Sequence, residues 1–132
     1  MTVVALIVGA GGAPGQGRPV TLADVAGTWD GTFTMGPRDS AIATFVLTAT
    51  PDGKGWTLLL PGHTPHATRV VAIAGDSVVT ETGPYASTRR PGQTVTTRMI
   101  LHVRGDAVSG SFVAHYSSGD SQGKIAARRR KV

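Results

Sequence analysis

The chain has 132 residues and a formal net charge of +5, and this length suits a single domain. Because the chain has no cysteine, it can form neither a disulfide framework nor a thiolate metal site. Aromatic residues make up only 5% of the chain and 18 residues are glycine, a composition that favours short strands and tight turns over helices. Nucleic-acid binding would need basic residues spread over a face between aromatic ones. The excess charge instead crowds one end, so no nucleic-acid partner is predicted; these residues are Lys124, Arg128, Arg129, Arg130 and Lys131.

Residues 1–20 form an apolar segment followed by a linker rich in glycine and proline. The apolar stretch 2–8 is too short to cross a bilayer as a helix, which needs about 20 residues, so no membrane span is predicted. One hypothesis is a clipped export signal, which implies a secreted, periplasmic or extracellular protein. The other is a joining strand that adds to the sheet edge of a neighbouring molecule. Its residues would be Val3, Val4, Leu6, Ile7 and Val8.

The predicted domain, residues 21–132, begins with a single short turn of helix over 22–26. Residues 28–35 then alternate, with Trp29, Gly31, Phe33 and Met35 on one face and polar residues on the other. This alternation is typical of a half-buried strand.

Turn signals separate the remaining chain into further short strands. The predicted strands are 41–50, 56–60, 68–74, 77–82, 95–104, 107–116 and 123–130, with a short irregular strand near 86–89. Almost every connection has the length of a hairpin. The sequence therefore predicts an all-β fold, an up-and-down antiparallel barrel of about eight strands that is wide enough for one small ligand.

The run Gly27-Thr28-Trp29 at the first strand, the meander of strands and a basic residue in the last strand resemble the calycin superfamily, and small lipocalin-like domains in particular. The resemblance implies an Arg or Lys of the last strand that packs across the Trp ring and closes one end of the barrel. The matching positions are Trp29 and Arg128. In the haem-binding, nitrobindin-like calycins a histidine lies near the pocket mouth, and His115 is the candidate by position.

The ligand pocket is predicted from the inward-facing apolar positions. Glu81 and Arg98 lie on neighbouring strands; if they point inward they must pair, because an unpaired buried charge is costly, and otherwise they face water. With Tyr85 near the mouth, an inward pair would anchor a ligand or act as an acid and a base. The apolar lining would comprise Phe33, Phe45, Leu47, Leu58, Val70, Met99, Leu101 and Phe112.

The sequence offers few other candidates for metal binding or catalysis. His63 and His66 have the spacing of two metal ligands, but zinc takes three or four, so neither a metal nor a cofactor is predicted. No G-x-S-x-G elbow is present. An enzyme that uses Glu81, Tyr85 or a histidine is therefore the least supported alternative.

Two functions remain from the sequence. The first is an exported lipocalin-like barrel that binds a small apolar or amphipathic ligand. The alternative is an extracellular structural subunit that self-assembles by donating residues 2–8 to a neighbour. For the alternative, apolar residues out of phase with the predicted core would make protein contacts; they are Ile42, Val46, Leu59 and Ile100.

Overall fold

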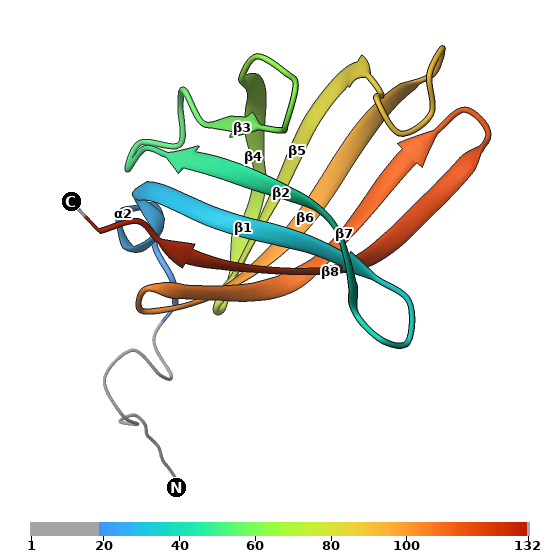
Figure 1. Cartoon of the computed structure of the whole chain (residues 1–132). Coiled ribbons are helices and arrows are strands. Elements are labelled where there is room, and N and C mark those ends of the chain that lie inside the picture. Colours follow the sequence, from blue (N-terminus) through green and yellow to red (C-terminus); the bar gives the residue numbers. More distant parts are fainter. Residues whose placement is uncertain (1–18, 132) are drawn as a thin grey trace, which may run out of the picture.

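The computed structural model describes residues 19–131, which form one closed barrel of eight antiparallel strands (Figure 1). The strands are β1 (Gly27–Met35), β2 (Ser40–Ala49), β3 (Thr57–Leu59), β4 (His66–Ala74), β5 (Ser77–Ala86), β6 (Thr94–Arg104), β7 (Ala107–Tyr116) and β8 (Gly119–Arg129), preceded by the short helix α2 (Leu22–Val25). Each strand pairs with the next, and β8 returns to pair with β1. The predicted all-β, up-and-down barrel is confirmed. No helix within residues 19–131 is long and apolar enough to cross a membrane.

Several strands differ in length from the prediction: β8 begins at Gly119 instead of residue 123, and residues 87–93 connect β5 to β6 where a short strand near 86–89 was expected. β5 runs on to Ala86 instead of stopping at Thr82, because a shift in register between Thr82 and Tyr85 carries the strand past Gly83 and Pro84. Such a bulge absorbs residues that would otherwise break the ladder. β3 has only three residues, Thr57–Leu59.

One end of the barrel, the closed end, is filled by side chains. Trp29 is fully buried there, and its Nε1 donates a hydrogen bond to the carbonyl oxygen of Val25 at 2.8 Å. This bond holds α2 across the barrel end. Trp56 is also buried and donates from Nε1 to the Thr50 carbonyl at 2.9 Å. The two large indole rings are thus both buried and both anchored by a hydrogen bond to a backbone carbonyl.

Arg129, and not Arg128, covers the Trp29 ring. The Arg129 guanidinium carbon lies 4.5 Å from the ring centroid. Arg129 and Trp29 are paired across β8 and β1, so both side chains lie on the inner face, whereas Arg128 is exposed. The expectation of Arg128 was wrong by one residue, and in a strand one residue moves a side chain to the opposite face.

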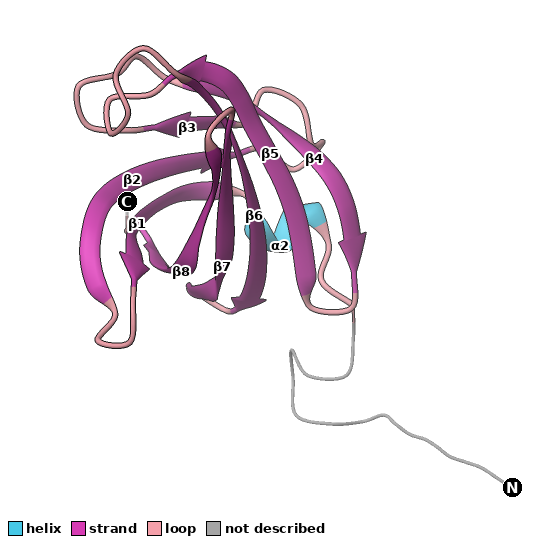
Figure 2. Cartoon of the chain, turned by 90° about the vertical axis from the view of Figure 1, so that its right-hand side faces the viewer, coloured by secondary structure: helices cyan, strands magenta, loops and turns pink. Residues whose placement is uncertain are grey.

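The opposite end of the barrel, the mouth, carries the connections 36–39, 60–65, 87–93 and 117–118. It faces right in Figure 1 and faces the viewer in Figure 2, where α2 lies behind the strands. The four connections therefore surround an opening that lies opposite the Trp29 plug.

The short β3 leaves part of β4 without a neighbour. β3 pairs with only two residues of β4, Ala67 and His66, and among residues 19–131 the stretch 69–74 of β4 pairs only with β5. Figure 2 shows this stretch at the right-hand margin, with no strand outside it. Val71 and Ile73 on it are 46% and 42% exposed. We call residues 69–74 the β4 edge.

Candidate functional site

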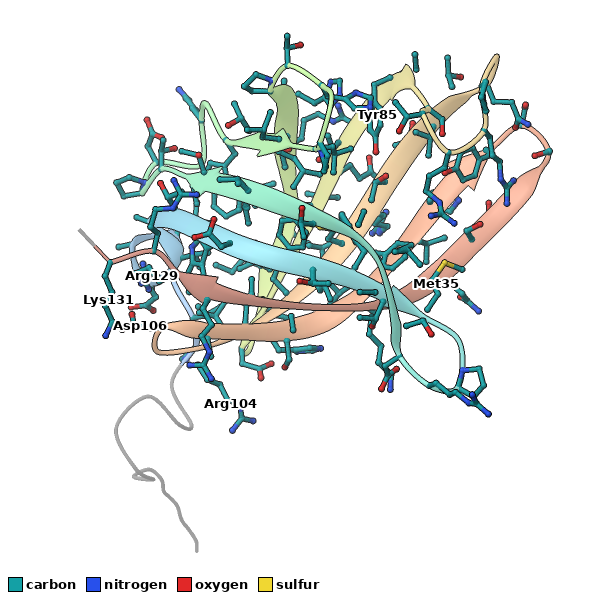
Figure 3. All side chains as sticks on the ribbon, in the orientation of Figure 1. Met35, Tyr85, Arg104, Asp106, Arg129 and Lys131 are labelled. Atoms are coloured by element: carbon teal, nitrogen blue, oxygen red, sulfur yellow. The ribbon has the colours of Figure 1, made fainter. Side chains whose placement is uncertain are left out.

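The mouth holds a cavity of about 240 Å³, which we call the mouth cavity. Phe33 and Phe112 form its deep apolar wall, with ring centroids 4.9 Å apart in an edge-to-face arrangement. Met35 of β1 and Tyr85 of β5 lie on well-separated sides of the opening (Figure 3). The cavity is therefore apolar in its depth and bounded by strands from across the barrel.

Three of the predicted pocket residues line this cavity, namely Phe33, Tyr85 and Phe112. Val70 is half-buried and packs against the core outside the cavity lining. The expectation that the remaining apolar residues line the pocket was wrong, because together with the two tryptophans they fill the core beneath the cavity. These residues are Phe45, Leu47, Leu58, Met99 and Leu101.

Glu81 and Arg98 do pair, but on the outer surface. Glu81 Oε2 lies 2.9 Å from Arg98 Nη1, and Glu81 Oε1 lies 3.3 Å from Arg69 Nη2. The hypothesis of a pair inside the barrel was wrong, because the flanking residues Thr80 and Thr82 are fully buried and alternation then turns Glu81 outward. A surface ion-pair network of this kind anchors no ligand in the barrel.

Two histidines and a tyrosine form an aromatic cluster at the rim of the cavity, in which His63 meets the other two rings edge-to-face. His63 Nδ1 lies 2.9 Å from His66 Nε2, and the His66 ring stacks on Tyr85 with centroids 4.3 Å apart. The Tyr85 hydroxyl lies 2.9 Å from the Thr97 hydroxyl. Burial raises the pKa of Tyr85. Burial, and then the neighbouring His63, lower the pKa of His66, so the neutral imidazole is the favoured form of His66 in the fold.

The second ring nitrogen of His63 has no partner. His63 lines the cavity, and its Nε2 is buried with no hydrogen bond to any residue between 19 and 131. A buried polar atom without a partner is rare in native proteins and often marks a place where water or a ligand binds. The sequence showed the His63 and His66 spacing, but nothing in it located this pair at the barrel mouth.

Two arginines lie at the mouth, and they differ in whether other side chains bind them. Arg90 donates to the hydroxyls of Ser118 and Ser121 at 2.8 and 2.9 Å and lies over the Tyr116 ring. Arg89 lines the cavity, is exposed, and makes no hydrogen bond or ion pair within residues 19–131. No Asp or Glu is present among the described residues that line the cavity, so its rim is positively charged.

The remaining histidine candidate lies elsewhere. His115 is exposed, contacts Asp120 at 3.0 Å, and does not line the mouth cavity. Its side chain lies on the outer face of β7, which is why the position implied by the resemblance does not reach the pocket. Within residues 19–131, no group of three or more His, Asp or Glu side chains is arranged to hold a metal ion.

Comparison of the chain with models of known protein families, with curated proteins and with solved structures found no match. The fold itself defines the class of protein, a closed eight-stranded up-and-down β-barrel. One end of this barrel is plugged by tryptophan and the other holds an apolar cavity with a cationic rim.

Proposed function

We propose that the protein is an exported, calycin-like carrier that binds a small apolar or amphipathic ligand in the mouth cavity. The observation that carries this proposal is the division of the barrel interior. Side chains fill the closed half, while the open half leaves about 240 Å³ between Phe33, Phe112 and Tyr85. Ligand sites are typically concave, mostly apolar and supplied with a few polar groups at their edge.

The size of the cavity sets the size of the ligand. Pockets for drug-sized molecules enclose about 300–1,000 Å³, and the mouth cavity is smaller than that. At about 30 Å³ for each water molecule, it has room for about eight. A short alkyl chain or a single aromatic ring therefore fits, with its remaining atoms at the opening.

The closed end supports the calycin part of the proposal. Gly27-Thr28-Trp29 opens the first strand, and a basic residue of the last strand, Arg129, lies over the Trp29 ring. Export is proposed from the apolar and small residues of 2–17, which lie outside the described residues.

The test is a titration of the isotope-labelled protein with 1-octanol, followed by ¹H–¹⁵N chemical shifts. We expect shifts concentrated around the mouth cavity. Ala43→Phe places a ring in the cavity and should abolish them, whereas Ala126→Phe, on the outer face of β8, should not. Equal binding by the wild type and the Ala43→Phe variant would refute a ligand site in this cavity.

A second function is favoured by the β4 edge. Unpaired backbone groups at a sheet edge accept an added strand, especially beside exposed apolar side chains such as Val71 and Ile73. The described chain begins next to this edge, since the Val20 amide donates to the Gly75 carbonyl at 2.7 Å. We propose as the alternative that residues 2–8, which lie outside the described residues, are donated to the β4 edge of another copy.

The alternative is tested by light scattering on the full chain. Assembly should disappear when the chain starts at residue 19, and also in Val71→Lys, which charges the β4 edge. Ala126→Lys is the matched control, because Ala126 is exposed but lies on β8, where Thr32 of β1 and Ser109 of β7 pair with it on both sides. A full chain that stays monomeric contradicts strand donation.

A further inference from the structure

We infer that the ligand of the mouth cavity carries a carboxylate, held at the rim by Arg89 and His63, while its apolar part lies against Phe33 and Phe112. This inference rests on the proposed carrier function and specifies the chemical class of the ligand. Its basis is a cation and a buried polar atom at one cavity, neither of which has a partner within residues 19–131.

His63 and His66 are joined by a hydrogen bond between their rings. One of the two facing nitrogens, His63 Nδ1 or His66 Nε2, carries the shared proton. When His66 donates from Nε2, neutral His63 keeps its own proton on Nε2. That N–H is then a buried donor at the cavity wall with no acceptor in the described chain. A carboxylate oxygen of the ligand provides the missing acceptor. A buried N–H group without an acceptor costs free energy, so this hydrogen bond favours binding.

Arg89 differs from the other charged side chains near the mouth because it has no ionic partner within residues 19–131. Two carboxylates lie in or next to the connections at the mouth, and both already have partners. Asp39 contacts Lys124 at 3.4 Å, and Asp120 contacts His115 at 3.0 Å. Arg90 is engaged by two serines. Arg89 is thus the cavity-lining cation left uncompensated within residues 19–131, and its planar fork matches the two oxygens of a carboxylate.

The mouth cavity is apolar in its depth and charged at its opening. Phe33 and Phe112 are 6% and 5% exposed, so they lie in the depth of the cavity, while Arg89 is exposed at its opening. A molecule with one charged end and one apolar end binds in this gradient in a single orientation. With room for about eight water volumes, the apolar part of the ligand is a short alkyl chain or one aromatic ring.

The experiment compares octanoate with 1-octanol, which share the same chain and differ in the head group. By isothermal titration at neutral pH, wild-type protein should bind octanoate about tenfold more tightly than octanol. Raising NaCl from about 20 to about 500 mM should weaken binding of octanoate but not of octanol, because the rim is exposed to salt.

Variants assign the effect to the two residues. Arg89→Gln should reduce the preference for octanoate over octanol to within about twofold, since the exposed Arg89 contributes through its charge. His63→Phe should reduce the preference in part. Arg38→Gln is the matched control, because it removes the same charge from an exposed residue in the β1–β2 turn that does not line the cavity.

The outcomes separate this inference from the carrier function. If octanol and octanoate bind the wild type equally, the carboxylate inference is overturned and the carrier stands. If the preference for octanoate survives in Arg89→Gln, the assigned residue is wrong and the inference is overturned as well. If neither compound binds, the carrier function fails, and this inference fails with it.

Discussion

Thr80 and Thr82 face the barrel interior from the same strand, β5, but their hydroxyl groups differ in one respect. The Thr82 hydroxyl lies 2.7 Å from the Thr68 hydroxyl, and both residues are buried. The Thr80 hydroxyl is buried with no hydrogen-bond partner within residues 19–131. Because a buried, unpaired polar group costs free energy while a paired one contributes it, two neighbouring threonines should respond oppositely to loss of the hydroxyl.

We predict that Thr80→Val raises the free energy of unfolding by about 1 kcal/mol, and that Thr82→Val lowers it by about 1–2 kcal/mol, since it strands the Thr68 hydroxyl. Valine has nearly the shape of threonine, so packing changes little. Urea denaturation of the two variants measures both values. Destabilisation by both substitutions to the same extent would show that the Thr80 hydroxyl is satisfied in solution.

At the scale of secondary-structure elements, Arg129 links three parts of the closed end. Its side chain donates to the Asp24 carbonyl at 2.7 Å, to the Ala26 carbonyl, and to the Asp106 carboxylate at 2.8 Å. Figure 3 shows Arg129 and Asp106 next to each other at this end. One residue of β8 therefore connects α2, the start of β1 and the turn between β6 and β7.

We predict that Arg129→Ala lowers the free energy of unfolding by about 2–3 kcal/mol, because it removes the contact with Trp29 and the hydrogen bonds that Arg129 donates to the carbonyls of Asp24 and Ala26. Arg128→Ala, one residue away and exposed, should change it by less than about 0.5 kcal/mol. Thermal and chemical denaturation of the pair gives the comparison. Equal effects of the two substitutions would contradict the closing role of Arg129.

Some strands reveal their inner face in the sequence and others do not, for physical reasons. In β6 the alternation of Val95, Met99 and Val103 with polar residues predicted the inner face correctly, because a half-buried strand has a period of two. In β8 alanines stand on both faces, Ala126 exposed and Ala127 buried. They give no contrast, so the phase of the arginines was missed.

The candidate site was harder to predict than the barrel. Phe33 and Phe112 were found because they lie on predicted strands, where position along the chain implies direction. Tyr85 was expected near the mouth in the connection after residue 82, and the structure has it on β5. His63 and Arg89 lie in the β3–β4 and β5–β6 connections, which have no periodicity. Their convergence depends on barrel closure, and the location of the cavity depends on how much space the tryptophans fill.

At the scale of the whole molecule, the His66 stack makes stability depend on pH. The pKa of His66 in the fold lies below its ordinary value of 6.5, so between these two values the unfolded chain binds more protons than the folded one. The free energy of unfolding therefore rises with pH across that window. The pKa values of Asp30, Asp52 and Asp76 are lowered from the ordinary value of 3.8. These carboxylates therefore change the free energy of unfolding only at a more acidic pH.

We predict that the melting temperature is constant above about pH 7 and falls as the pH drops below about 6.5, as neutral His66 is lost from the stack with Tyr85. His66→Gln should flatten this dependence. His102→Gln, at the other end of the barrel, should leave it in place. Thermal melts of the three proteins between about pH 7.5 and 5 make the comparison; an unchanged slope in His66→Gln would assign the dependence to another group.

The closed end also holds both ends of the described chain. Residue 19 leads directly into α2, and residue 131 follows the last residues of β8, where Arg129 pairs with Trp29. The mouth lies at the far side of the barrel from both. An affinity handle, a fusion partner or a sensor surface attached directly at residue 19 or at residue 131 therefore stands behind the plug, and the cavity continues to face the surrounding solution.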